Sequence, residues 1–186
     1  MYQVKDFWAE VPLRGKWEQW VNIPRFLDCC RSCPNFGQVW SCPPYSFDPL
    51  SIWNSYDTVQ ICCRQICFND EALQIAYPPQ ELGQISKELL QREQDALLEK
   101  MMELERQNRG SMALAAGSCA ACAPMDCARK TGGRCRHPEK IRYSLESLGA
   151  DVGRIVEEQF GLKMLWGQEG HLPEYYLLVA GIFKNQ

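Results

Sequence analysis

Eleven cysteines in a chain of 186 residues constrain this protein more than any other feature of its sequence. They form three groups, at Cys29, Cys30, Cys33 and Cys42, at Cys62, Cys63 and Cys67, and at Cys119, Cys122, Cys127 and Cys135. Disulfide frameworks are typical of small secreted domains, whereas grouped thiols in a reducing compartment usually serve metal or redox chemistry. The cysteine count is odd, and the first ten residues lack the apolar segment of a secretory signal. We therefore expect a cytoplasmic, metal-binding protein.

The remaining composition is that of an ordinary globular chain. Apolar residues make up 46% of the sequence, which is enough for a core, and the net charge of -3 gives no general attraction to nucleic acid or anionic lipid. No apolar run approaches the roughly 18 residues of a membrane-spanning helix. We expect one domain over residues 1–186, with cysteine-rich loops at 29–45 and 117–138 as its metal-binding elements, and neither nucleic acid nor membrane as a partner.

Periodicity and turn residues predict a succession of strands and helices. The predicted helices span residues 49–56, 79–108, 139–148 and 151–160, and the predicted strands span residues 58–68, 112–116, 162–166 and 175–183. Residues 24–45 are rich in Pro, Gly, Asn and Ser and are predicted to form a loop. The alternation favours an α/β or α+β fold, with a mixed β-sheet flanked by helices.

The last cysteine group has the spacing of a metal site. Cys119, Cys122, Cys127 and Cys135 lie within 17 residues of a glycine-containing loop, so four thiolates can converge on Zn²⁺ or on an iron–sulfur cluster. Small residues between the cysteines favour the cluster, because they let backbone N–H groups approach its sulfides. Cations also stabilise the negative charge of such a cluster. The loop is basic, and we expect Arg136 and Arg142 around the cofactor, although a basic loop can also serve an acidic partner or a phosphate.

The first cysteine group supplies three ligands and leaves the fourth open. Cys30, Cys33 and Cys42 are expected to bind metal, and Cys29 or a cysteine of the middle group could complete the site. Three cysteines on a cubane would leave one iron free for a substrate, whereas four would suit electron transfer or a structural role.

The cysteines of the middle group are predicted to pack in the core rather than to bind metal. Alternation along the strand at 58–68 places Cys63 and Cys67 on one face and Cys62 on the other, so the three cannot bind one metal. Cysteine also packs well as a small apolar residue. The two histidines, His137 and His171, are predicted to be a surface or cluster-adjacent residue and a solvated turn residue, respectively.

Two signatures resemble those of a family of cysteine-rich predicted metal-binding proteins of unknown function. One is the run Cys30-Arg-Ser-Cys-Pro-Asn-Phe-Gly-Gln-Val-Trp-Ser-Cys-Pro-Pro44, and the other begins at Ala-Gly-Ser-Cys119-x2-Cys122 and continues with Cys135-Arg-His-Pro-x3-Arg-x-Ser-x-Glu-x-x-Gly149. The resemblance implies that seven cysteines are metal ligands, namely Cys30, Cys33, Cys42, Cys119, Cys122, Cys127 and Cys135. It also implies that Arg142, Ser144 and Glu146 lie close to the cofactor or face a ligand.

These observations predict a protein with one or two [4Fe–4S] clusters that serves electron transfer or the redox support of a partner enzyme. One alternative is an enzyme that binds a small molecule at the open iron of a three-cysteine cluster. Another alternative is a structural or binding module braced by zinc.

Overall fold

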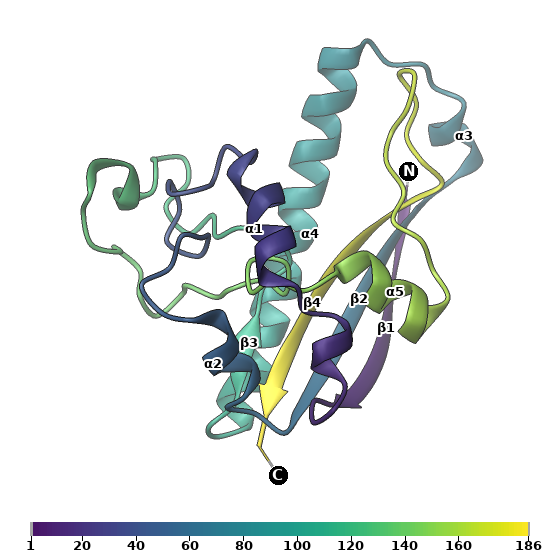
Figure 1. Ribbon diagram of the computed structural model, residues 1–186. Coiled ribbons are helices and arrows are strands. Elements are labelled where there is room, and N and C mark those ends of the chain that lie inside the picture. The colour runs from purple at the N-terminus through teal and green to yellow at the C-terminus, as the bar shows by residue number, and fades with distance from the viewer. Residues whose placement is uncertain (1, 186) are drawn as a thin grey trace.

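A four-stranded antiparallel sheet forms the centre of the protein (Figure 1). The computed structural model describes residues 2–185. The strand order is β1-β2-β4-β3, and the bounds are β1 (Tyr2–Pro12), β2 (Thr58–Phe68), β3 (Met112–Leu114) and β4 (Tyr175–Lys184). β2 and β4 are the inner strands, and both are buried over most of their length. Both strands are rich in β-branched and apolar residues, and such strands are stable when other elements pack on both of their faces.

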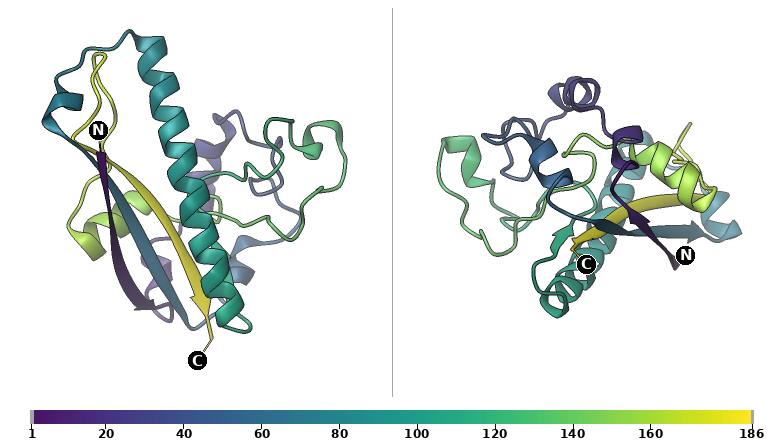
Figure 2. Two further views of the ribbon diagram at one scale, coloured as in Figure 1. Left: turned by 180° about the vertical axis from the view of Figure 1, so that it is seen from behind. Right: turned by 60° about the horizontal axis from the view of Figure 1, so that its bottom comes forward.

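One face of the sheet is covered by the long helix α4 (Pro79–Gln107), as the view from behind shows (Figure 2). Apolar residues recur on α4 at helical spacing, and Leu89, Leu97 and Met101 are buried against the sheet. They pack on one set of alternating side chains from β2, which includes Cys62 and Ile66.

The opposite face is covered by shorter elements. These are α5 (Val152–Phe160), α2 (Pro49–Trp53), the 3₁₀ helix η1 (Trp17–Gln19) and the turns at 144–149. Asp151 caps α5 by accepting a hydrogen bond from the backbone N–H of Arg154, and Asp48 caps α2 in the same way at Leu50. The other side chains of β2, including Cys63, pack in this second core.

Three further elements complete the chain. α1 (Ile23–Arg31) leads into the first cysteine-rich segment, α3 (Asp70–Leu73) follows β2, and the 3₁₀ helix η2 (Ala128–Thr131) lies within the last cysteine group. Both cysteine-rich segments project together to one side of the sheet, away from β1 (Figures 1 and 2). They form a lobe of irregular chain, which we call the cysteine lobe and define as residues 29–45 and 117–142.

The α+β class is confirmed, but the predicted mixed sheet is wrong, because all three strand pairs of the described residues are antiparallel. The predicted helix at 139–148 is wrong, because Ser144 and Ser147 hydrogen-bond to each other's backbone and hold this segment in turns. The predicted strand at 162–166 is also wrong, since this segment pairs with no strand.

Part of the predicted loop at 24–45 is helical. Asn22 accepts a hydrogen bond from the backbone N–H of Arg25 and begins α1, and Pro24 occupies the first turn, where proline is tolerated. Among residues 2–185, no helix combines the length and apolar character needed to cross a membrane.

Candidate metal centres

The first cysteine group lies where α1 ends and a tightly turned loop begins. Cys29 and Cys30 occupy the last turn of α1, and the backbone N–H of Cys33 donates to the carbonyl of Cys30 at 2.9 Å. The loop then returns, and the backbone N–H of Cys42 donates to the carbonyl of Val39 at 3.0 Å. Backbone bonds therefore fold the loop back so that Cys42 approaches the end of α1.

The thiols of this group are close enough to affect one another's ionisation. The pKa of Cys42 is raised to about 11, mainly by burial, with a smaller contribution from the thiols of Cys33 and Cys30 and an opposing hydrogen bond from the Ser41 hydroxyl. Burial also raises the pKa of Cys30, with added contributions from Cys33, Cys29 and the carboxylate of Glu146. The structure thus brings Cys30, Cys33 and Cys42 near one another, and it places Glu146 beside Cys30.

The four cysteines of the last group share one cavity. All four of its thiols line a space of about 160 Å³, together with residues of the first cysteine loop such as Asn35 and Trp40. This space exceeds that of one ion, since a water molecule accounts for about 30 Å³ of the liquid. Burial raises the pKa of Cys119, and the three other thiols raise it further. The backbone N–H of Ala121 hydrogen-bonds to Cys119 and opposes this shift, in the manner that short residues between cysteines permit.

Ser41 links the first cysteine group to the last one. It is 1% exposed, and its hydroxyl accepts a 2.9 Å hydrogen bond from the backbone N–H of Cys119. The same hydroxyl hydrogen-bonds to the thiol of Cys42. A second link runs between the side chains of Asn35 and Ser118 at 2.9 Å. One buried hydroxyl therefore contacts both candidate centres.

Arg129 fastens η2 to the first cysteine loop. Its guanidinium donates to the backbone carbonyls of Val39, Cys42 and Pro44. It also stacks over the Trp40 ring, 4.9 Å from the ring centre. A planar fork of donors suits this convergence of carbonyls, which an ammonium group could not match. From the sequence, Arg129 was only one of several basic residues, because the carbonyls that it binds lie more than 80 positions earlier.

The two arginines expected near the cofactor have other contacts. Arg136 is exposed and donates to the carbonyl of Asp126 at 2.8 Å, which closes the loop of the last cysteine group. Arg142 forms an ion pair with Glu105 of α4, and Glu105 also accepts from the backbone N–H of Ala113. Arg142 shares the lining of a small hollow with Cys119. Both arginines therefore brace the chain around the last cysteine group, and their role toward a cofactor stays a prediction.

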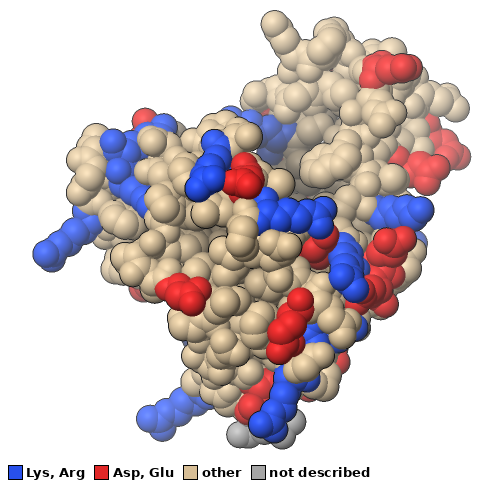
Figure 3. All heavy atoms as spheres, in the orientation of Figure 1, with Lys and Arg blue, Asp and Glu red and all other residues tan. Residues whose placement is uncertain are grey.

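Basic side chains nevertheless mark the surface of the cysteine lobe. Lys and Arg spheres are spread over the left-hand part of the molecule in Figure 3, where this lobe lies. Between residues 119 and 142 the chain has six basic residues against Asp126 and Glu139. His137 also lines the cavity of the last cysteine group.

The middle cysteine group is separate from both centres. Cys62 and Cys63 are fully buried in opposite cores of the sheet, which confirms the predicted alternation. Burial raises the pKa of each to about 12. Cys67 lines a different cavity, with Tyr2 and Gln3. None of the three contributes to the site at Cys30.

The donor set fits a thiolate-bound metal, although it is not drawn tightly around one point. All eleven thiols are free. Within the described residues, no three Cys, His, Asp or Glu side chains are gathered closely enough to hold a single metal ion. The seven candidate ligands thus form two neighbouring groups whose members lie within electrostatic reach of one another but further apart than the ligands of one ion.

Comparison with known proteins shows the family of the chain. Searches of curated proteins and of solved structures gave no significant match. The sequence model of one family matches residues 17–182, which cover all three cysteine groups and most of the sheet. The chain therefore belongs to the family described as predicted metal-binding proteins (DUF2284).

Proposed function

We propose that the protein holds two iron–sulfur centres side by side and passes electrons to or from a partner enzyme. A [4Fe–4S] cluster would occupy the last cysteine group, and a second centre would use Cys30, Cys33 and Cys42. The observation that carries the proposal is the hydroxyl of Ser41, which hydrogen-bonds both to the thiol of Cys42 and to the backbone of Cys119. Two centres so joined have the proximity that an electron relay needs.

The volume between the thiols of the last cysteine group supports a cluster over zinc. A structural zinc ion needs four ligands at about 2.0–2.3 Å from one point. A cluster is held by thiolates that stand further apart, around a larger volume. The 160 Å³ cavity inside the last cysteine group offers that volume.

The surroundings of the thiols also suit a negatively charged cluster. The potential of such a cluster depends on net charge, on hydrogen bonds to sulfur and on exposure to solvent. Here Ser41 donates to Cys42 and the backbone N–H of Ala121 donates to Cys119. Both bonds stabilise the thiolate forms, which are the forms that bind iron.

A partner enzyme with an acidic docking surface would match the charge of the cysteine lobe. Arg134, Arg136 and Lys140 are exposed on the loop of the last cysteine group. Complementary charge steers electron-transfer partners together and sets their orientation. The free thiols favour a reducing compartment, so we propose a cytoplasmic location.

A second candidate function is an enzyme with a small-molecule site at the first centre. A cavity of about 170 Å³ adjoins Cys30, and apolar side chains such as Phe26, Leu27 and Phe47 line most of it. An iron left open at this centre would face that cavity. A zinc-braced binding module is the third candidate.

Metal analysis of anaerobically purified protein separates these candidates. We expect iron and acid-labile sulfide in equal amounts, little zinc, and loss of roughly half of the iron in Cys122→Ala if both centres are cubanes. Cys62→Ala is the matched control, because Cys62 is buried away from both centres, and it should retain all of the iron. Stoichiometric zinc without sulfide would reject the iron–sulfur proposal and favour the zinc module.

A further inference from the structure

One buried oxygen of this protein has no hydrogen-bond partner. Among the described residues, the only buried side-chain nitrogen or oxygen without one is Oε2 of Glu146. The Ser144 side chain and the backbone N–H of Glu146 itself hydrogen-bond to the carboxylate and leave Oε2 unpaired. A buried, unpaired carboxylate oxygen is costly unless a cation or a metal compensates it.

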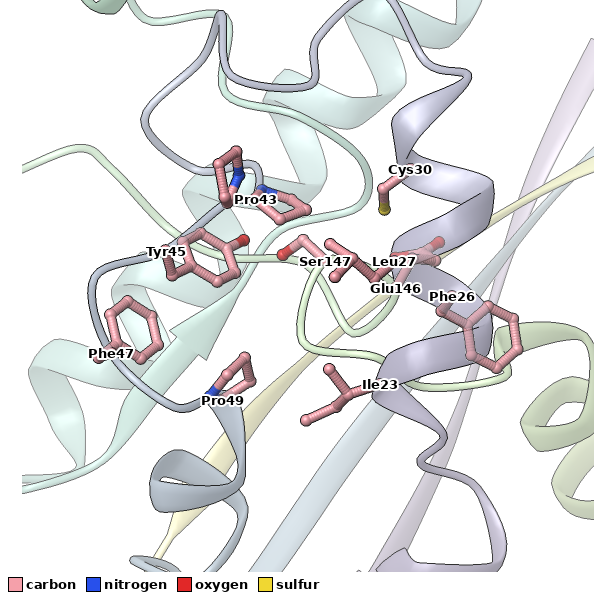
Figure 4. Close-up of a pocket in the computed structure, with 11 residues that line it drawn as sticks. Ile23, Phe26, Leu27, Cys30, Pro43, Tyr45, Phe47, Pro49, Glu146 and Ser147 are labelled. Carbon is pink, nitrogen blue, oxygen red and sulfur yellow. The ribbon is translucent and has the colours of Figure 1, made fainter.

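The carboxylate of Glu146 lies beside the first centre. Glu146 and Cys30 line the same cavity, between α1 and the loop that carries Tyr45 (Figure 4). The sulfur of Cys30 points from α1 toward the turn that carries Glu146 and Ser147 (Figure 4). The residue with the unpaired oxygen therefore shares a cavity with Cys30 of the first centre.

Backbone packing fixes this arrangement. The turn at 144–149 ends at Gly149, which has a φ of 88°, and its carbonyl accepts a 2.9 Å hydrogen bond from the backbone N–H of Asn22. A Cβ at position 149 would lie 2.7 Å from Cγ1 of Ile23. The absence of a side chain here lets α1 lie against the turn, which holds Cys30 close to Glu146.

The other candidates for the fourth ligand are less well placed. Cys62 and Cys63 are buried in the cores of the sheet, and Cys67 lines another cavity. The hydroxyl of Tyr45 donates to the carbonyl of Ser41 at 2.7 Å. Cys29 is near Cys30 but exposed on the surface of α1.

We propose that Glu146 is the fourth ligand of the first centre and binds iron through Oε2. The inference rests on the proposed function, since it requires a metal at Cys30, Cys33 and Cys42. A carboxylate carries the same single negative charge as a thiolate, so the net charge of the centre would match that of a four-cysteine site. It is a harder ligand that suits iron less well than sulfur does. The iron at Glu146 should therefore be the first to exchange.

The direct test replaces the carboxylate by its amide. We expect Glu146→Gln, purified anaerobically as the full chain, to keep the three thiolate ligands and to lose the one iron that Glu146 would hold, which is about one iron in eight if both centres are cubanes, with a changed spectrum of the first centre. The matched control is Cys29→Ser, which removes the competing ligand and should retain the iron. Full iron and unchanged spectra in Glu146→Gln would overturn the proposal, whether or not Cys29→Ser loses iron.

A second variant separates loss of a ligand from loss of packing. Glu146→Cys restores a ligand at the same position, so it should regain the iron that Glu146→Gln loses. If neither variant holds the first centre while circular dichroism shows a native fold, the proposal is wrong.

A spectroscopic measurement tests the bond itself. In protein grown with ¹³C-carboxyl glutamate, electron–nuclear double resonance on the reduced centre should show a ¹³C coupling that Glu146→Gln lacks. Wild-type protein without this coupling would contradict the ligand assignment. Wild-type protein without iron or sulfide would instead reject the proposed function itself, so the two failures are distinguishable.

Discussion

The backbone N–H of Cys119 donates a 2.9 Å hydrogen bond to the hydroxyl of Ser41, the residue directly before Cys42. Ser41 is almost completely buried, and the same hydroxyl hydrogen-bonds to the thiol of Cys42. Cys42 and Cys119 lie 77 positions apart in the chain. The hydroxyl of Ser41 therefore connects the first cysteine group to the last one in the fold. This contact would couple the first centre to the second.

Ser41→Ala should disturb both centres at once. The change leaves the partly buried N–H of Cys119 without its partner, which should cost about 1 kcal/mol of unfolding free energy. It also removes a donor to the sulfur of Cys42, so the reduction potential of the first centre should fall, because donors to sulfur favour the reduced, more negative state. Chemical denaturation and a potentiometric titration measure the two effects. The exposed Ser32→Ala is the matched control, and equal behaviour of the two variants would contradict the bridging role of Ser41.

Arg129→Lys should loosen the first cysteine loop. The guanidinium of Arg129 binds three backbone carbonyls, and a lysine ammonium lacks the planar fork that these contacts need. We expect faster hydrogen–deuterium exchange over residues 37–44 and a stability loss of about 1–3 kcal/mol. Arg134→Lys is the control. Arg134 is exposed in the last cysteine group, which also carries Arg129, and its replacement should leave the exchange of residues 37–44 unchanged. If both variants exchange like the wild type, Arg129 does not hold the loop.

Gly149→Ala should separate α1 from the turn that carries Glu146. The new Cβ would meet Ile23 at 2.7 Å, and the φ of 88° disfavours any side chain. Gly161→Ala is the matched control, because it shares a positive φ of 65° but has no atom within 4 Å of the added Cβ. Gly149→Ala should therefore be less stable than Gly161→Ala by at least about 1 kcal/mol. Equal losses would mean that the contact with α1 is unimportant.

Thiol alkylation should separate the packed cysteines from the others. Cys62 and Cys63 are fully buried, and their pKa values of about 12 keep them protonated and unreactive up to mildly alkaline pH. In chelator-treated native protein at pH 8, iodoacetamide should modify the exposed Cys29 and Cys33 first, as mass spectrometry would show. Modification of Cys62 and Cys63 at the same rate would contradict their place in the core. Unfolded protein provides the control, in which all eleven cysteines react.

The regular elements that the sequence predicted are those with clear local signals at their ends. The strand at Thr58–Phe68 is confirmed, and so is the helix that begins after Pro78 and ends near Asn108. α5 begins at its Asp151 cap and ends at Gly161, as predicted. β1 was not predicted, because it is an edge strand with most of its side chains exposed and lacks a clear alternation of apolar residues.

The groups of cysteines could be predicted from their spacing, but their mutual arrangement could not. Spacing indicated that the last four thiols converge, and they do line one cavity. The role of Ser41 and the clamp by Arg129 depend on contacts between segments that are about 80 positions apart. The turns at 144–149 depend on hydrogen bonds between Ser144 and Ser147, which a helical apolar pattern conceals.

Electron paramagnetic resonance of the fully reduced protein tests the central claim most directly, since that claim is that two iron–sulfur centres adjoin at Ser41. The account predicts signals split or broadened by magnetic interaction between two reduced centres, and a simpler spectrum without this interaction in Cys122→Ala. Two independent signals that merely add together would contradict the proximity of the two centres. A protein that shows no iron–sulfur signal and contains zinc instead would contradict the whole claim.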